Sequence, residues 1–264
     1  MFPSAVTFQP AKSVSKTILV PDNYPTIAAA IGNAAEGDVI YVRNGFYNET
    51  VLEIDKTLTL RGEDVRNTVV HLNPPLVNFT NVLGQTYLVP SNAIRVNAIN
   101  VRLSGFTITS PGGISATGDG TEIISNIITI GRSPFRLNSF ITVFRGCILS
   151  GSNLTIAKNT LTGDDWSLTG SNQNLEENAI NGTISTEGNN CIIYDNNIIG
   201  DLIVQGSSNA ITRNYYSMLH LKYGDSNTIN GNSGELSLGN SDFSFSNNTV
   251  SGNIIKGSSP WEYG

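Results

Sequence analysis

Charged residues are scarce in this sequence. They make up 14% of its 264 residues, and the formal net charge is −6. A nucleic-acid-binding surface needs clustered Lys and Arg, and no such cluster occurs, so we expect no nucleic-acid partner. No run of 18 apolar residues occurs either, so we expect no segment that spans a membrane.

Histidine, cysteine and methionine are also scarce, with two of each. The sequence contains no zinc-type Cys/His cluster, HExxH motif, P-loop, EF-hand or RTX-type repeat. We therefore expect no metal and no other cofactor. Cys147 and Cys191 are separated by 44 positions, more than two units of the repeat described below. We expect two separate, buried thiols and no disulfide.

Asparagine is abundant and recurs in a ladder. Each ladder Asn follows a large apolar residue by three positions, and the intervals between successive members are 19, 18, 18, 18 and 16 residues. The members are Asn159, Asn178, Asn196, Asn214, Asn232 and Asn248. A short fixed period is the signature of a solenoid.

The repeat unit identifies the kind of solenoid. About 18 residues are too few for a paired-helix repeat, which needs roughly 33. Runs of three to five strand-forming residues alternate with Gly, Asn, Ser and Asp. Three short strands joined by turns make one coil of a parallel β-helix, and coils stack about 4.8 Å apart. The alternative, a β-sandwich, offers no reason for a constant interval. We predict an all-β, right-handed parallel β-helix of about ten coils.

The predicted domain organisation is simple. Residues 1–16 form an extended lead-in, residues 17–255 form the β-helix, and residues 256–264 form a C-terminal tail. The only good helix pattern spans about residues 25–35, where Ile27, Ala30, Ile31 and Ala34 share one face. A solenoid needs a cover over its terminal coil, so we expect this helix to be an N-terminal cap.

One run of sequence resembles a known family. VPDNYPTIAAAI, followed by GDVIYVRNGFYNETVLEIDKTLTLRGE, is similar to the N-terminal cap of the pectin-lyase-like superfamily of right-handed β-helices. The similarity covers about residues 17–72 closely and the coils of 145–255 generically. It is closest to the NosD-like and DUF1565-like (PbH1-repeat) members. This resemblance implies the fold. The Gly-x-Tyr-x-Glu element at residues 45–49 is shared with pectin methylesterases but also occurs in many non-esterase members, so it indicates the fold and not the chemistry.

Catalytic motifs of the best-known members are missing. Asp164 and Asp165, the only adjacent Asp pair, resemble the Asp pair of polygalacturonases, but that family's other elements are absent. The sets used by pectate lyases and pectin methylesterases are absent too. A Ser-His-Asp site would have to use His71 or His220, and neither lies in a nucleophile-elbow context. These observations favour a protein that is not an enzyme, with Asp164 and Asp165 as weak catalytic candidates.

The residues that precede four successive ladder asparagines are charged. They are Lys158, Glu177, Asp195 and Arg213, which stacking would place in one column about 4.8 Å apart. One interpretation is solvent-exposed pairing worth a few tenths of a kcal/mol. The other is a carbohydrate-binding strip, to which Tyr194, Tyr215, Tyr216 and Tyr223 would add stacking faces.

Two functions remain open. The first is a non-enzymatic structural protein, extracellular or on the cell surface, that binds copies of itself end to end or side by side in filaments or layers. The alternative is a polysaccharide-binding or polysaccharide-cleaving β-helix, with a site near projecting loops at about 76–92 and 131–140, beside Arg132, Arg136 or Arg145. The N-terminus lacks an export-signal pattern, so an exported protein would have lost its signal or carried it outside this sequence. Five Asn-x-Ser/Thr sequons are compatible with an extracellular location.

Overall fold

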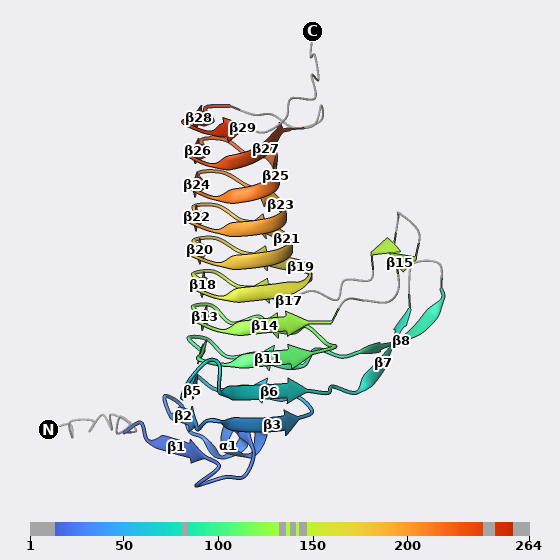
Figure 1. The fold of residues 1–264 in the computed structure, drawn as a ribbon, viewed down its shortest axis with the longest axis vertical. Coiled ribbons are helices and arrows are strands. Elements are labelled where there is room, and N and C mark those ends of the chain that lie inside the picture. Colours follow the sequence, from blue (N-terminus) through green and yellow to red (C-terminus); the bar gives the residue numbers. More distant parts are fainter. Residues whose placement is uncertain are drawn as a thin grey trace, which may run out of the picture.

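The chain forms a parallel β-helix. The computed structural model describes residues 14–80, 84–131, 136–137, 141–142, 147–239 and 246–255, the side chains at 136–137, 141–142 and 164 excepted. One sheet contains 11 strands, one from each turn of the solenoid, so the stack has 11 coils (Figure 1). The predicted fold class is confirmed. The structure has 11 coils, whereas the sequence predicted about ten.

The 11-stranded sheet consists of short strands, here called the short-strand sheet. Its members, in stacking order, are β1 (Thr17–Val20), β2 (Val39–Val42), β5 (Thr59–Gly62), β10 (Arg102–Ser104), β13 (Glu122–Ile124), β18 (Thr155–Ala157), β20 (Asn174–Glu176), β22 (Ile192–Tyr194), β24 (Ala210–Thr212), β26 (Thr228–Asn230) and β28 (Thr249–Ser251). Register places one buried aliphatic residue per coil in a single column, for example Leu175, Ile193 and Ile211. This column forms one wall of the core, which is why the apolar residue recurs with the period of the coil.

The second sheet has two arms. One arm contains β3 (Gly45–Glu49), β6 (Thr68–Leu72), β11 (Thr107–Ser110) and β14 (Ile127–Ile130), and the other contains β4 (Leu52–Ile54), β9 (Ile94–Val96), β12 (Ile114–Ala116) and β17 (Cys147–Ser150). Both arms join at β19 (Thr160–Thr169) and continue as long strands, β21 (Ala179–Glu187), β23 (Asn197–Gln205), β25 (Tyr215–Tyr223) and β27 (Ser233–Leu238), ending at β29 (Ile254–Ile255). From β19 onward, one strand therefore replaces the earlier pair.

Glycine lies at the bend within the long strands β21 and β23. Gly182 and Gly200 have φ of 151° and 153°, values that side chains rarely adopt, and a Cβ atom on Gly200 would lie 2.4 Å from the Gly182 carbonyl oxygen. Only glycine permits both this conformation and this approach. The bend turns the second half of each long strand onto a separate face of the solenoid.

Helix α1 (Ile27–Asn33) is shorter than the predicted segment of about residues 25–35. The Thr26 side chain caps it by accepting a 3.1 Å hydrogen bond from the Ala29 N–H. Ile27, Ala30 and Ile31 are buried, and the helix packs against β1, β2, β3 and β4. It lies at the β1 end of the stack (Figure 1).

Two hairpins project on one side of the stack, where Figure 1 shows β7, β8 and β15. Strands β7 (Leu76–Thr80) and β8 (Thr86–Pro90) pair antiparallel, as do β15 (Arg136–Leu137) and β16 (Ile141–Thr142). They interrupt the chain after β6 and β14, at the corner between the two arms. The regions predicted as loops thus contain hairpins. Arg132 and Arg145 lie outside the described residues, as do Phe245, Trp261 and Tyr263.

The asparagine ladder is a buried hydrogen-bonded column. The Oδ1 atom of each member accepts a bond from the backbone N–H of the preceding member, as from Asn178 to Asn196 at 3.0 Å. The column runs through Asn126, Asn159, Asn178, Asn196, Asn214, Asn232 and Asn253. These amides satisfy backbone groups at a tight corner.

Asn248 was wrongly placed in this column. It belongs to a second ladder at the opposite end of the short strands, where its Oδ1 accepts from the Asn227 N–H at 2.8 Å. Strand register pairs Ile229 with Val250, so the equivalent of Asn232 is Asn253. The last interval is therefore 21 residues, and the spacing from Phe245 to Asn248 is a coincidence.

Candidate functional site

The four predicted charged residues do lie in one column, here called the charge column: Lys158, Glu177, Asp195 and Arg213. Each has a left-handed backbone, with φ between 54° and 58°. Gly105, Gly231 and Gly252 occupy this corner position in other coils, also with positive φ. A side chain in this conformation costs roughly 1–2 kcal/mol, a cost that the four charged residues carry and the three glycines avoid.

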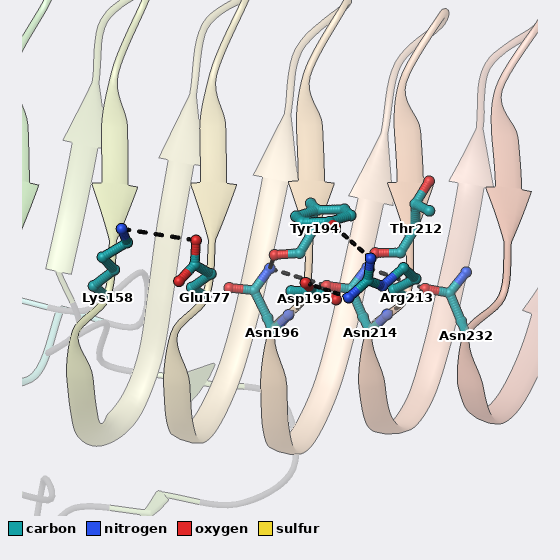
Figure 2. A network of polar contacts seen from close by, with 9 residues as sticks. All are labelled: Lys158, Glu177, Tyr194, Asp195, Asn196, Thr212, Arg213, Asn214 and Asn232. Carbon is teal, nitrogen blue, oxygen red and sulfur yellow. Dashed lines mark hydrogen bonds and ion pairs between the residues drawn. The ribbon is translucent and has the colours of Figure 1, made fainter.

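The charges in the column pair with one another (Figure 2). Lys158 Nζ lies 3.8 Å from Glu177 Oε1, and Arg213 Nη2 lies 2.9 Å from Asp195 Oδ2. Arg213 also donates a 2.6 Å bond to the Tyr194 hydroxyl, and its guanidinium carbon lies 4.9 Å from the centre of that ring. A carbohydrate at this column would have to displace these contacts.

The tyrosines do not form one stacking surface. Tyr194 is covered by Arg213, and Tyr215 is 48% exposed on the outer face of β25. Tyr216 is 3% exposed, and burial raises its pKa to about 12. The prediction that Tyr216 offers a face to sugars is therefore wrong, because the neighbouring position on a strand points into the core.

A groove runs across the outer face of the long strands, and we call it the long-strand groove. Its volume is about 470 Å³, within the range typical of ligand sites. It crosses β19, β21, β23 and β25, and its lining is Asp165, Trp166, Ser167, Thr183, Ser185, Thr186, Glu187, Ile203, Gln205 and Lys222. Asp165, one of the two predicted catalytic candidates, lies in it, whereas the side chain of Asp164 lies outside the described residues.

Strand register arranges the groove in rows. Ser167, Ser185, Ile203 and His220 are paired in sequence across four coils. Glu187 and Gln205 are likewise paired in the next row. Because paired residues repeat about every 4.8 Å, a polymer lying across the coils meets side chains at a regular interval.

The groove offers both hydrogen-bond donors and acceptors. It is lined by the carboxylates of Asp165 and Glu187, the Gln205 amide, the Lys222 ammonium and three partly exposed hydroxyl-bearing residues, Ser167, Thr183 and Ser185. The Tyr223 hydroxyl donates a 3.2 Å bond to Glu187 Oε1. Burial, followed by the neighbouring Glu187 carboxylate, raises the pKa of Tyr223. This bond holds the Glu187 side chain at the groove.

The sequence analysis missed most of these residues. Glu187, Gln205 and Lys222 carry no motif, and the only available signal was that outward positions of successive long strands recur at the 18-residue period. A second cavity of about 220 Å³ adjoins the groove, since Lys222 lines both. Its other lining residues are His220, Leu221, Ser237 and Gly239.

Within the described ranges, no three His, Cys, Asp or Glu side chains gather where they could hold a metal ion. No helix among the described residues is long and apolar enough to cross a bilayer. Cys147 and Cys191 are free and buried, and burial raises the pKa of both thiols.

Comparison with known proteins shows the fold. No protein-family model matches the sequence, and curated protein sequences contain no match. Among solved structures, the chain is similar to a pectin methylesterase from Erwinia chrysanthemi (15% identity, TM-score 0.47, 93% of this chain and 92% of that one). It is also similar to a rice weevil pectin methylesterase (12%, 0.46, 93% and 92%) and to a pectin methylesterase solved with a hexasaccharide (15%, 0.47, 86% and 81%).

These proteins are right-handed parallel β-helices of the pectin-lyase-like fold, as predicted for this chain. They also correct our leading functional prediction. We expected a non-enzymatic, self-assembling structural protein, and that prediction is wrong by this comparison, because the similar structures are enzymes that act on carbohydrate. At 12–15% identity the similarity extends to the fold alone, so the alternative function has to be argued from this chain's own residues.

Proposed function

We propose that this protein binds a polysaccharide in the long-strand groove. The observation that carries the proposal is a 470 Å³ groove whose polar lining residues pair in register on neighbouring coils, Ser167 with Ser185 and Glu187 with Gln205. Carboxylate and amide groups accept and donate hydrogen bonds to sugar hydroxyls, and the coil period presents them along a line. A repeating ligand matches a repeating surface.

The charge of the groove favours a neutral sugar chain. Two carboxylates, Asp165 and Glu187, face a single lysine, Lys222, among the lining residues. A strongly acidic polymer would meet net repulsion at such a surface, since like charges oppose binding. Hydrogen bonds from carboxylates to uncharged hydroxyls are charge-assisted and carry no such penalty.

The spacing of the carboxylates favours binding over cleavage of the chain. Asp165 pairs with Thr183, and Glu187 follows Thr183 by four residues on the same strand. Four residues of strand span roughly 13 Å, so the two backbones are far apart. Glycosidases hold their paired carboxyl groups about 5–9.5 Å apart. Asp165 therefore serves as a sugar-binding group in this proposal.

Two expectations from the sequence remain predictions. One is an extracellular or cell-surface location, where polysaccharides are accessible. The other is a specific relationship to NosD-like proteins, for which the support is the similarity of residues 17–72. The members of the charge column already pair with one another, and the column is not part of the proposed binding site.

A glycan array followed by calorimetry with the best neutral oligosaccharide tests the function. Glu187→Ala should weaken binding by about 10-fold or more, because a hydrogen bond to a charged group is worth about 1.5–3 kcal/mol. Gln205→Ala should weaken it by about 2- to 10-fold, because a hydrogen bond to a neutral amide is worth about 0.5–1.5 kcal/mol. Glu177→Ala in the charge column is the matched control and should bind like the wild type. Absence of any bound glycan, or loss of binding only in the control, would refute the proposal.

A further inference from the structure

Three residues beside the long-strand groove lie on consecutive coils in an order that suits acyl transfer. Asp201 belongs to β23, His220 to β25 and Ser237 to β27. His220 Nε2 lies 3.8 Å from Asp201 Oδ2. On the other side, His220 is paired in register with Ser237. The imidazole thus lies between a carboxylate and a hydroxyl.

All three side chains belong to the outer face. Leu219 and Leu221, which flank His220, are fully buried, so His220 points outward, and its side chain is 32% exposed. Residues paired across parallel strands project on the same face about 4.8 Å apart. Ser237 therefore stands beside the imidazole on the next coil.

A cavity of about 220 Å³ opens onto this group. His220, Ser237 and Lys222 all line it, and Lys222 also lines the long-strand groove. A nucleophile, a base and a cation consequently share one space that adjoins the proposed polysaccharide site. A Ser-His-Asp site is recognised by such geometry and roles, whatever the fold and the sequence order.

We propose that Ser237, His220 and Asp201 form an ester-hydrolysing site. Ser237 Oγ attacks the acyl carbonyl carbon while His220 takes its proton, and Asp201 stabilises the imidazolium that forms. The Lys222 ammonium faces the negative charge that develops on the carbonyl oxygen. His220 then returns the proton to the departing alcohol, leaving an acyl-serine.

Water completes the reaction. His220 removes a proton from a water molecule that attacks the acyl-serine, and the serine leaves with that proton. Ester and water thus yield alcohol and carboxylic acid with no further reactant. The substrate class is an O-acyl ester on a sugar held in the groove; the choice of a sugar ester rests on the proposed function, whereas the hydrolytic chemistry does not.

Labelling of the full chain with a fluorophosphonate probe, followed by peptide mass spectrometry, tests the site. We expect the probe on Ser237 and no labelling of Ser237→Ala. Ser233 is the matched control, because it lies on the same strand, β27, but pairs with Tyr215 in place of a histidine. Ser233→Ala should label like the wild type. His220→Gln should slow labelling and p-nitrophenyl acetate hydrolysis about 100-fold, and Asp201→Asn about 10-fold.

Circular dichroism melts show whether each variant is folded, and these outward positions should tolerate substitution. An unlabelled Ser237, or equal labelling of His220→Gln and wild type, would overturn the proposal. Glycan binding is read separately, through Glu187→Ala. Labelling of Ser237 without glycan binding would support the hydrolytic site and refute a sugar ester as its substrate. Glycan binding without labelling would support the proposed function and refute the hydrolytic site.

Discussion

Asn214 Oδ1 accepts a 3.0 Å hydrogen bond from the backbone N–H of Asn196, one coil earlier. The Asn196 side chain repeats the arrangement toward Asn178 and donates from Nδ2 to the Leu175 carbonyl at 2.7 Å. Each amide thereby satisfies two buried backbone groups of the preceding coil. The ladder thus connects neighbouring coils in addition to strand pairing and core packing.

Asn196→Ala should lower the free energy of unfolding by about 2–5 kcal/mol. The substitution leaves the Asn178 N–H and the Leu175 carbonyl buried without these partners, at roughly 1–3 kcal/mol each. Asn197→Ala, at the exposed neighbouring position, should stay within about 0.5 kcal/mol of the wild type. Denaturant unfolding followed by circular dichroism measures both, and equal midpoints would contradict the proposed role of the ladder.

Gly206→Ala should destabilise the protein by more than 2 kcal/mol. Its φ is 119°, and a Cβ atom would lie 2.1 Å from the Gly188 carbonyl oxygen, so the backbone would have to shift. Gly32→Ala in helix α1 is the control, because a Cβ there has nothing within 4 Å. That change should stabilise the helix by about 0.5–1 kcal/mol. If Gly206→Ala were as stable as Gly32→Ala, the stacked glycines would tolerate a methyl group and the prediction would be wrong.

Asp38 makes stability depend on pH. Its carboxylate is 1% exposed and accepts bonds from the Lys16 and Ala35 N–H groups at 2.9 and 2.8 Å. The bond from Lys16, chiefly, holds the pKa of Asp38 below its ordinary value of 3.8. A lowered folded-state pKa contributes stability that is complete above the unfolded-state value and is lost as pH falls through the folded-state value.

Asp38→Asn should therefore lower the free energy of unfolding by about 1–3 kcal/mol at pH 7. The difference in this free energy between the variant and the wild type should shrink below about pH 4. Unfolding midpoints measured from pH 7 down to pH 2 test this. Asp55→Asn, at a residue whose side chain is 63% exposed, is the control and should follow the wild type. A penalty for Asp38→Asn that is constant with pH would show that the carboxylate charge is not involved.

The charge column should contribute little to stability. Arg213 and Asp195 are 61% and 28% exposed, and exposed pairs are worth about 0.2–1 kcal/mol. A double-mutant cycle with Arg213→Ala and Asp195→Ala should give a coupling energy in that range, which falls as salt is added. A coupling above 2 kcal/mol, or one that salt does not change, would show that the pair is shielded from solvent.

Repetition in the chain was enough to predict the architecture. A side chain that must meet its equivalent every coil leaves a constant interval, so Ile193 and Asn196 recur with their counterparts at 18 residues. Stacking of identical neighbours is a local constraint on each repeat. For the same reason, the sequence alone was enough to place four charged residues in one column: Lys158, Glu177, Asp195 and Arg213.

Repetition did not predict which residues of a nine-residue strand face outward. Nor did it predict which face of the solenoid those residues occupy. That depends on the bend at Gly182 and Gly200 and on register shifts, as between Ile198 and Asp201. The insertion before Asn248 likewise moved it to another ladder. The groove and the Asp201–His220–Ser237 group each join side chains from separate coils, so their composition depends on the phase of each strand. Tertiary structure decides that phase, because core packing selects which alternate side chains are buried.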